Sequence, residues 1–132
     1  MRVSVSYLRP AIASGTDRES VRLAIGRAAD ATGADFTYLF NQAKSESGLN
    51  PYAKASTSSA GGLFQFIDQT WLGVLKAHGA EHGYGAAAAA ITPRRGGGWT
   101  VADPQARQAI FALRNDPQAA SLMAGEFARD NA

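Results

Sequence analysis

Helix-start signals recur along the chain, and they constrain its fold more than any other feature. In each of them a capping side chain stands just ahead of apolar residues at helical spacing. Thr16 and Glu19 form a capping-box pattern, in which Glu19 reaches back to the Thr16 backbone. In Asp103-Pro104 and Asp116-Pro117 the capping acid precedes a proline at the first helical position. These signals predict a mostly α-helical fold.

Glycines and prolines indicate where the helices stop, because glycine ends a helix at low cost and proline cannot continue one. The expected segments run from Thr16 to Gly33, from Asp35 to Gly48, from Asp68 to near Gly79, from Ala86 to Ala90, and onward from Asp103 and Asp116. Asp35 and Asp68 are the expected caps of the second and third segments. Arg94 to Gly98 is typical of a loop, and no strand-like alternation follows residue 15. We expect residues 1–15 to form an N-terminal arm, extended around Val3, Val5 and Tyr7, and residues 16–132 to form one helical domain.

Length and composition exclude several classes of protein. A chain of 132 residues is long enough for one domain with a hydrophobic core. It has no cysteine, which excludes disulfides and thiolate metal sites. The net charge of +2 is too small to indicate a nucleic-acid partner, although a mild basic excess suits an anionic polymer such as a bacterial cell wall. No apolar run approaches the ~20 residues of a membrane span, and Met1 to Pro10 has no secretory-signal pattern.

Glu46 is the first candidate for chemistry, near the end of the second expected helix. Helical spacing places it over Leu39, Gln42 and Ala43, on or beside the face that packs inward. A half-buried carboxyl near the negative end of the helix dipole would hold its proton more tightly, as a general acid requires. The alternative is an ordinary solvated glutamate, which is the commoner state of glutamates on helices.

Gly61-Gly62-Leu63-Phe64-Gln65-Phe66 is the second unusual element. An amide held among apolar neighbours can donate and accept hydrogen bonds, which suits an N-acetyl sugar, and paired glycines let a ligand approach the backbone. The alternative is a turn into a buried segment, with Gln65 pairing a backbone group.

Together the two elements resemble the soluble lytic transglycosylase family, whose catalytic domain is related to goose-type lysozyme. The resemblance rests on Glu46-Ser47-Gly48-Leu49-Asn50-Pro51 followed by Gly62-Leu63-Phe64-Gln65-Phe66 and then Thr70, and it covers roughly residues 36 to 78. Phe64 replaces the usual methionine, and Asp68 stands where the family usually has proline.

The resemblance implies a lysozyme-like helical fold and an enzyme of the bacterial periplasm or cell envelope that needs no cofactor. Its substrate would be peptidoglycan, cleaved at the β-1,4 bond between N-acetylmuramic acid and N-acetylglucosamine. Glu46 would protonate the leaving oxygen and then take the proton of the C6 hydroxyl, which closes a 1,6-anhydro ring without water. Ser47, Gly62, Phe64 and Gln65 would line the cleft or orient the glutamate.

The family's third motif, typically Ala-Tyr-Asn-Ala-Gly, is absent, and Tyr84 within His82 to Gly85 matches it poorly. We therefore expect either a fragment or a divergent member of the family. The alternative function is a catalytically impaired module that binds glycan or belongs to a secretion or flagellar assembly that crosses the wall.

The remaining candidates are weaker. His78 and His82 have the i, i+4 spacing of metal ligands, but neighbouring glycines interrupt the helix and no carboxylate motif completes a site, so we predict no metal site. Trp71, on an apolar helix face, is expected in the core, whereas Trp99 could stack on sugars. Arg94 and Arg95 could meet muramyl carboxylates, although solvated loop charges are the commoner case.

Overall fold

The computed structural model describes residues 15–132, and this part of the chain is mostly α-helical, as the sequence predicts. The helices are α1 (Arg18–Thr32), α2 (Phe36–Ser47), α3 (Asp68–His78), α4 (Gly85–Ala90), α5 (Pro104–Ala112) and α6 (Pro117–Asp130). Two short 3-10 helices, η2 (Gly79–His82) and η3 (Leu113–Asn115), extend α3 and α5. The expected extended arm around Val3, Val5 and Tyr7 lies outside the described residues.

Three of the predicted caps are confirmed. The carboxylates of Asp35, Asp103 and Asp116 accept hydrogen bonds from the backbone N–H three residues later, at 2.9, 2.9 and 3.1 Å. The predicted stops at Gly33 and Gly48 are also confirmed, since both are left-handed, with φ of 79° and 63°. The sequence therefore sets both ends of α2, the helix that carries Glu46.

Two of the predicted caps are wrong. α1 is capped by Asp17, which accepts from the Ser20 N–H at 2.7 Å, so the helix begins one residue later than a Thr16 cap requires. Glu19 pairs instead with Arg22 at 2.8 Å. Asp68 is the first residue of α3 and not its cap, and its carboxylate accepts from the Arg114 guanidinium at 3.1 Å.

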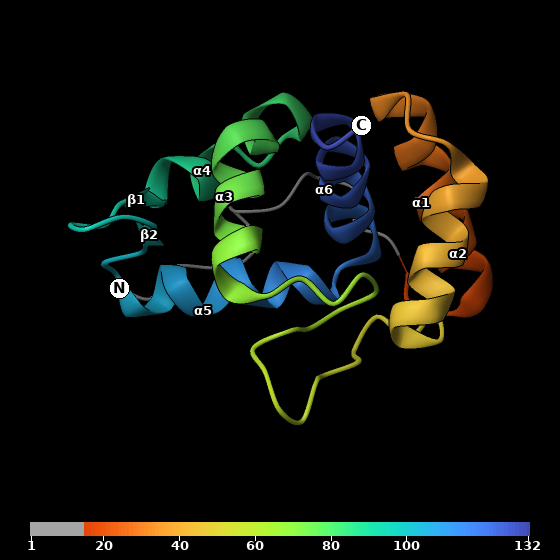
Figure 1. Cartoon of the computed structure of the whole chain (residues 1–132), viewed down its shortest axis with the longest axis horizontal. Coiled ribbons are helices and arrows are strands. Elements are labelled where there is room, and N and C mark those ends of the chain that lie inside the picture. Colours follow the sequence, from red (N-terminus) through yellow and green to blue (C-terminus); the bar gives the residue numbers. More distant parts are fainter. Residues whose placement is uncertain (1–14) are drawn as a thin grey trace.

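The elements surround α6, as Figure 1 shows, with α1 and α2 on one side, α3 on the other and α5 across one end. α1 packs along α6 more extensively than any other pair of helices. A small antiparallel hairpin of β1 (Thr92–Pro93) and β2 (Trp99–Thr100) pairs Thr92 with Thr100, and the predicted loop of residues 94–98 forms its turn. The segment of residues 48–67 forms a long irregular loop between α2 and α3.

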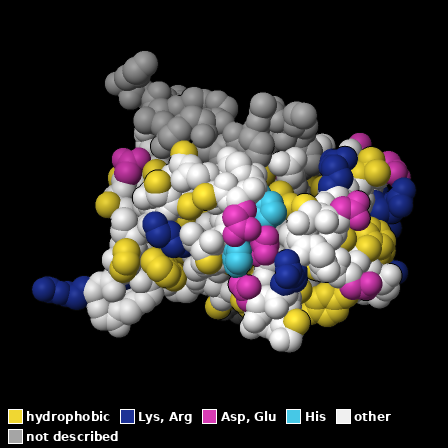
Figure 2. All heavy atoms as spheres, turned by 90° about the horizontal axis from the view of Figure 1, so that it is seen from above, with side chains coloured by type: hydrophobic (Ala, Val, Ile, Leu, Met, Phe, Trp, Pro, Cys, Tyr) yellow, Lys and Arg dark blue, Asp and Glu magenta, His cyan; other side chains and the backbone are white. Residues whose placement is uncertain are grey.

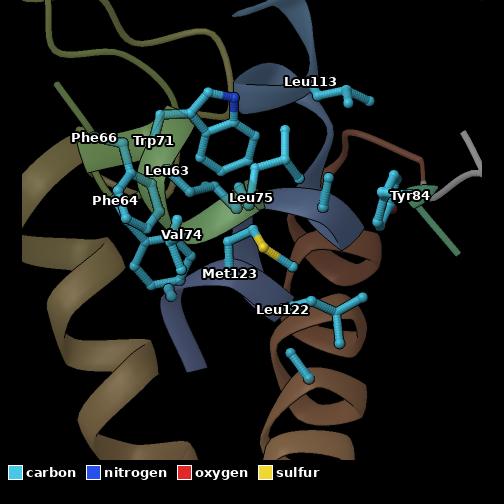
Figure 3. Close-up of a cluster of buried hydrophobic side chains, with 14 of the residues drawn as sticks. Leu63, Phe64, Phe66, Trp71, Val74, Leu75, Tyr84, Leu113, Leu122 and Met123 are labelled. Carbon is cyan, nitrogen blue, oxygen red and sulfur yellow. The ribbon is translucent and has the colours of Figure 1, made fainter. Parts of the chain in front are cut away.

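Trp71 lies at the centre of the core and is fully buried, which confirms its predicted place. Its indole N–H donates to the Ile110 carbonyl at 2.9 Å, so the polar group is satisfied inside the core. The ring centroid of Phe66 lies 5.2 Å from that of Trp71, and Leu63 and Leu75 pack nearby (Figure 3). The irregular segment before α3 is thereby anchored to the helices through its apolar side chains.

Among residues 15–132, every helix is too short or too polar to cross a bilayer.

Candidate glycan-binding groove

Glu46 lies in the last turn of α2, and its side chain is exposed. The expectation of a half-buried carboxyl is wrong, because the buried row of α2 runs through Leu39 and Ala43 to Ser47. Ser47 is half-buried, and its hydroxyl donates to the Ala43 carbonyl at 2.9 Å. Glu46 belongs to the neighbouring row, with Tyr38 and Gln42.

A groove of about 280 Å³ opens between α2, the start of α3 and the end of α6. It is lined by Tyr38, Gln42, residues 64–67, Thr70, Ala124, Phe127, Ala128 and Asn131. Of the residues predicted to bind substrate, Phe64 and Gln65 line this groove, whereas Ser47 and Gly62 do not. Glu46 is also outside the lining, one helical turn beyond Gln42 along the same face of α2.

Gln65 is held by its own side chain in an uncommon backbone conformation. Its φ is 52°, and its side-chain N–H₂ donates to the carbonyls of Ala53 and Gly62 at 3.1 and 2.9 Å. The alternative reading, in which Gln65 pairs backbone groups, is therefore confirmed. Since both amide hydrogens are used, the side-chain oxygen is the part that a ligand in the groove could engage.

Gly62 is required by the fold, because its φ is 83° and a Cβ there would collide with the Arg114 carbonyl oxygen. The close backbone approach that this glycine permits is made by Arg114. The expectation that the paired glycines leave room for a ligand is wrong at this position.

Left-handed backbone occurs at two residues other than glycine in the described part of the chain. Within residues 15–132, Leu49 and Gln65 are the non-glycine residues with positive φ, at 65° and 52°. Leu49 lies in the element Glu46 to Pro51, and Gln65 lies in the element Gly62 to Phe66. Such conformations cost about 1–3 kcal/mol each, and they persist where the surrounding structure enforces them, often beside functional sites.

Exposed aromatic and aliphatic side chains surround the groove, and the sequence did not identify them. Tyr38, Ile67 and Phe127 are 55%, 48% and 40% exposed. Phe127 follows Met123 by one helical turn, a spacing that is typical of the core face of a helix. Its ring instead packs edge-on against Phe66, with centroids 6.0 Å apart, and borders the groove. The i, i+4 spacing of Tyr38, Gln42 and Glu46 in the sequence was a signal that could have placed Tyr38 on the same exposed face of α2 as Glu46.

Two other aromatic candidates lie away from the groove. Tyr84, the weak match to the third family motif, is fully buried, and its hydroxyl accepts from Gln118 at 3.3 Å. Trp99 is half-buried beside α3, where Gln69 bonds its backbone N–H and carbonyl at 2.8 and 3.0 Å. Neither ring lines the groove.

The loop cations predicted as candidates for muramyl carboxylates lie on the β1–β2 turn. Arg94 and Arg95 are both exposed, and the Arg94 guanidinium donates to the Gly97 carbonyl at 3.1 Å. They are outside the groove lining.

Arg114 holds the segment that forms one wall of the groove. Its guanidinium donates to the carbonyls of Ser59 and Phe66 at 2.8 and 2.9 Å, as well as to Asp68. Burial lowers the pKa of Arg114, and the Asp68 charge opposes that shift. One half-buried cation thus holds two carbonyls of the segment that forms the groove wall and the first residue of α3.

A cluster of histidines and acids lies on another face of the molecule, and the sequence missed it. In Figure 2 the two histidines lie among carboxylates. His78 and Glu81 come from the end of α3 and from η2, and Glu126 and Asp130 come from α6. A hydrogen bond to Asp130 raises the pKa of His78, burial lowers it, and Glu81 adds to the increase. The glycine interruptions predicted beside the histidines are confirmed, but α6 supplies the carboxylates that no local motif provides.

No model of a known protein family matches this chain. The two motifs, the groove and the chemistry of their residues are the features that bear on function.

Proposed function

We propose that the protein is a peptidoglycan lytic transglycosylase with a lysozyme-like helical domain and with Glu46 as its acid/base. One observation carries the proposal: both described non-glycine residues with left-handed backbone, Leu49 and Gln65, lie in the two sequence elements that resemble this family. Packing and hydrogen bonds hold a costly conformation in both elements, which is common where a side chain must be aimed at a ligand.

The groove has the character of a sugar site. Tyr38 and Phe127 offer exposed rings, and Gln42, Gln65 and Asn131 offer amides beside them. Aromatic faces pack against the apolar faces of sugar rings, and amides can bond hydroxyl and acetamido groups. We expect an N-acetyl sugar to bind in this groove of about 280 Å³.

Glu46 stands where the next sugar of a glycan strand would reach. It follows Gln42 by four residues, an advance of about 6 Å along α2, comparable with the length of a sugar unit. Its carboxylic acid donates a proton to the glycosidic oxygen as the C1–O4 bond breaks, and the substrate's acetamido group stabilises the cation. The carboxylate then accepts the proton of the C6 hydroxyl as O6 bonds to C1. Because Glu46 gives up one proton and then regains one, a single carboxyl suffices where most glycosidases use two.

A non-catalytic module that binds peptidoglycan is the second candidate function, as an envelope protein or a part of a secretion or flagellar assembly. Two observations favour it: Glu46 is exposed outside the groove lining, and Tyr84 is buried in the core and does not face the substrate. A groove that holds sugar without an acid in a dry environment would bind glycan and leave it intact.

Replacement of Glu46 separates the two functions. Glu46→Gln keeps the size of an exposed side chain, so the fold should be retained, while release of soluble muropeptides from purified sacculi should fall at least ~100-fold. Glu19→Gln, an exposed helix glutamate on α1, is the matched control and should retain full activity. Mass spectrometry of the products identifies 1,6-anhydro ends, which are lighter than reducing ends by one water.

Each outcome of this experiment decides a point. Equal release by Glu46→Gln and the parent would refute Glu46 as the acid/base. Binding of the parent to sacculi without any release would refute the enzyme and favour the binding module. Reducing ends in place of anhydro ends would replace the transglycosylase with a hydrolase.

A further inference from the structure

Three potential ligand atoms converge where η2 meets α6. They are Nδ1 of His78 and one carboxylate oxygen each from Glu81 and Glu126, and all lie within 4.8 Å of one another. Nδ1 of His78 is 3.2 Å from Glu81 Oε1 and 3.7 Å from Glu126 Oε1. Ligands bound about 2.1 Å from one tetrahedral ion lie about 3.4 Å apart, so both separations already suit a shared ion.

Neighbouring side chains hold two of these three ligands through hydrogen bonds, as is common for metal ligands in proteins. The second ring nitrogen of His78, Nε2, lies 2.7 Å from Asp130 Oδ2. Histidines bound to zinc commonly donate their other N–H to a carboxylate in this way. The second oxygen of Glu126 lies 2.6 Å from Nε2 of His82, and Glu126 is only 7% exposed. A buried carboxylate with one oxygen fixed by a histidine presents its other oxygen to the same point as His78.

We propose that His78, Glu81 and Glu126 bind one divalent ion of the zinc type, with Asp130 and His82 as positioning residues and water in the fourth place. One imidazole and two carboxylates form a small nitrogen and oxygen set that suits zinc and its neighbours, whereas calcium requires six to eight oxygens. The ion would tie η2 and the end of α3 to α6, on the side of α6 that bears Glu126 and Asp130. The groove lies on the side that bears Phe127 and Asn131, so the ion site does not depend on the proposed activity.

The sequence predicts no metal site because Glu126 and Asp130 lie far along the chain from the two histidines. Glu126 lies 44 residues from His82, and Asp130 lies 52 residues from His78. Only the packing of α3 and η2 against α6 brings them together.

Zinc titration of the full chain tests the site. The chelator-treated protein should bind one equivalent of Zn²⁺ by calorimetry at mildly alkaline pH, whereas Ca²⁺ and Mg²⁺ should bind more weakly. The chain has two histidines, so imidazole nitrogen NMR should show Nδ1 of His78 as the atom that moves on zinc addition. Zinc should also raise the unfolding midpoint, because binding stabilises only the folded arrangement.

Single substitutions separate ligands from bystanders. Glu81 has a side chain that is 60% exposed, so Glu81→Gln removes a ligand without disturbing the core and should weaken Zn²⁺ binding by at least ~10-fold. Asp130→Asn keeps the shape of the positioning residue and should weaken binding about 10–100-fold. Glu19→Gln is the matched control and should bind like the parent.

The alternative explanation is a cluster of ion pairs held together by protonated histidine. It predicts no stoichiometric zinc binding, and that result would overturn the proposal. Equal Zn²⁺ affinity in Glu81→Gln and the parent would also overturn it. An affinity unchanged by Asp130→Asn would remove the positioning role of Asp130.

Discussion

The helix pair α1–α6 and the segment of residues 48–67 are built on different principles. In the pair, small and branched apolar side chains such as Val21, Ile25 and Ala28 of α1 are buried, and most of α6 is buried as well. Each helix satisfies its own backbone hydrogen bonds, so the contact between α1 and α6 depends on the shapes of their side chains. The segment of residues 48–67 has no helix, and scattered backbone hydrogen bonds hold it in place. The Gly61 N–H donates to the Phe66 carbonyl at 3.1 Å, and the Gly62 N–H donates to the Ala53 carbonyl at 2.9 Å.

This difference decides which substitutions each region tolerates. A backbone that satisfies itself can exchange one small residue for another where space allows. A backbone that is fixed by left-handed turns and by the close approach of another chain segment cannot accept such an exchange. The groove wall belongs to the second kind, so the proposed substrate site depends on positions that bind no substrate.

Gly62→Ala should have the largest effect on stability. The new Cβ would collide with the Arg114 carbonyl oxygen, and alanine disfavours a φ of 83°. We expect a loss of more than about 3 kcal/mol in the free energy of unfolding, measured by urea denaturation.

Gly61→Ala is the control for that substitution. A Cβ at Gly61 would meet its nearest atom, in the Arg114 guanidinium, at 3.6 Å, which is an ordinary contact. A loss below about 1 kcal/mol is expected. Equal losses at the two glycines would show that the close approach of Arg114 does not constrain the segment.

Arg114→Ala should have the second-largest effect. It removes the donors to Ser59, Phe66 and Asp68 from a side chain that is only 15% exposed. We expect a loss of about 2–3 kcal/mol, by the same denaturation assay, because three acceptors lose a charged donor, and the buried Phe66 carbonyl is one of them.

Arg107→Ala provides the matched comparison. The guanidinium carbons of Arg107 and Arg114 lie 5.0 and 4.9 Å from the centre of the same Phe111 ring, but Arg107 is exposed. Its removal should cost less than about 0.5 kcal/mol. Similar losses for both arginines would assign the effect of Arg114 to the aromatic contact and would remove its role as a clamp.

Local chemistry explains why much of the helical framework could be predicted from the sequence. Asp35, Asp103 and Asp116 cap their helices through atoms three residues away, and Gly48 stops α2 by its own conformational freedom. The resemblance of the short element that contains Phe64 and Gln65 predicts both as cleft residues, and both line the groove.

The unpredicted features depend on contacts that no local pattern contains. Asp68 has the form of a cap, but Arg114, 46 residues away, takes its carboxylate. The exposure of Glu46 follows from which row of α2 meets the core, and helical spacing alone left two adjacent rows possible. Phe127 has the spacing of a core residue, and only the arrangement of α6 beside α2 and α3 shows that it borders a groove.

Gly26→Ala should have a smaller effect than Gly62→Ala or Arg114→Ala, with the opposite sign. Gly26 lies inside α1 without a left-handed φ, and a Cβ there would meet only the edge of Phe36, at 4.0 Å. Alanine should raise the free energy of unfolding by about 0.5–1 kcal/mol, because it loses less backbone freedom in a helix than glycine does. Urea denaturation of Gly26→Ala beside Gly62→Ala then compares one substitution in the two regions. A loss at Gly26 as large as the loss at Gly62 would mean that packing constrains α1 as tightly as backbone geometry constrains the segment, and the proposed difference between the regions would be wrong.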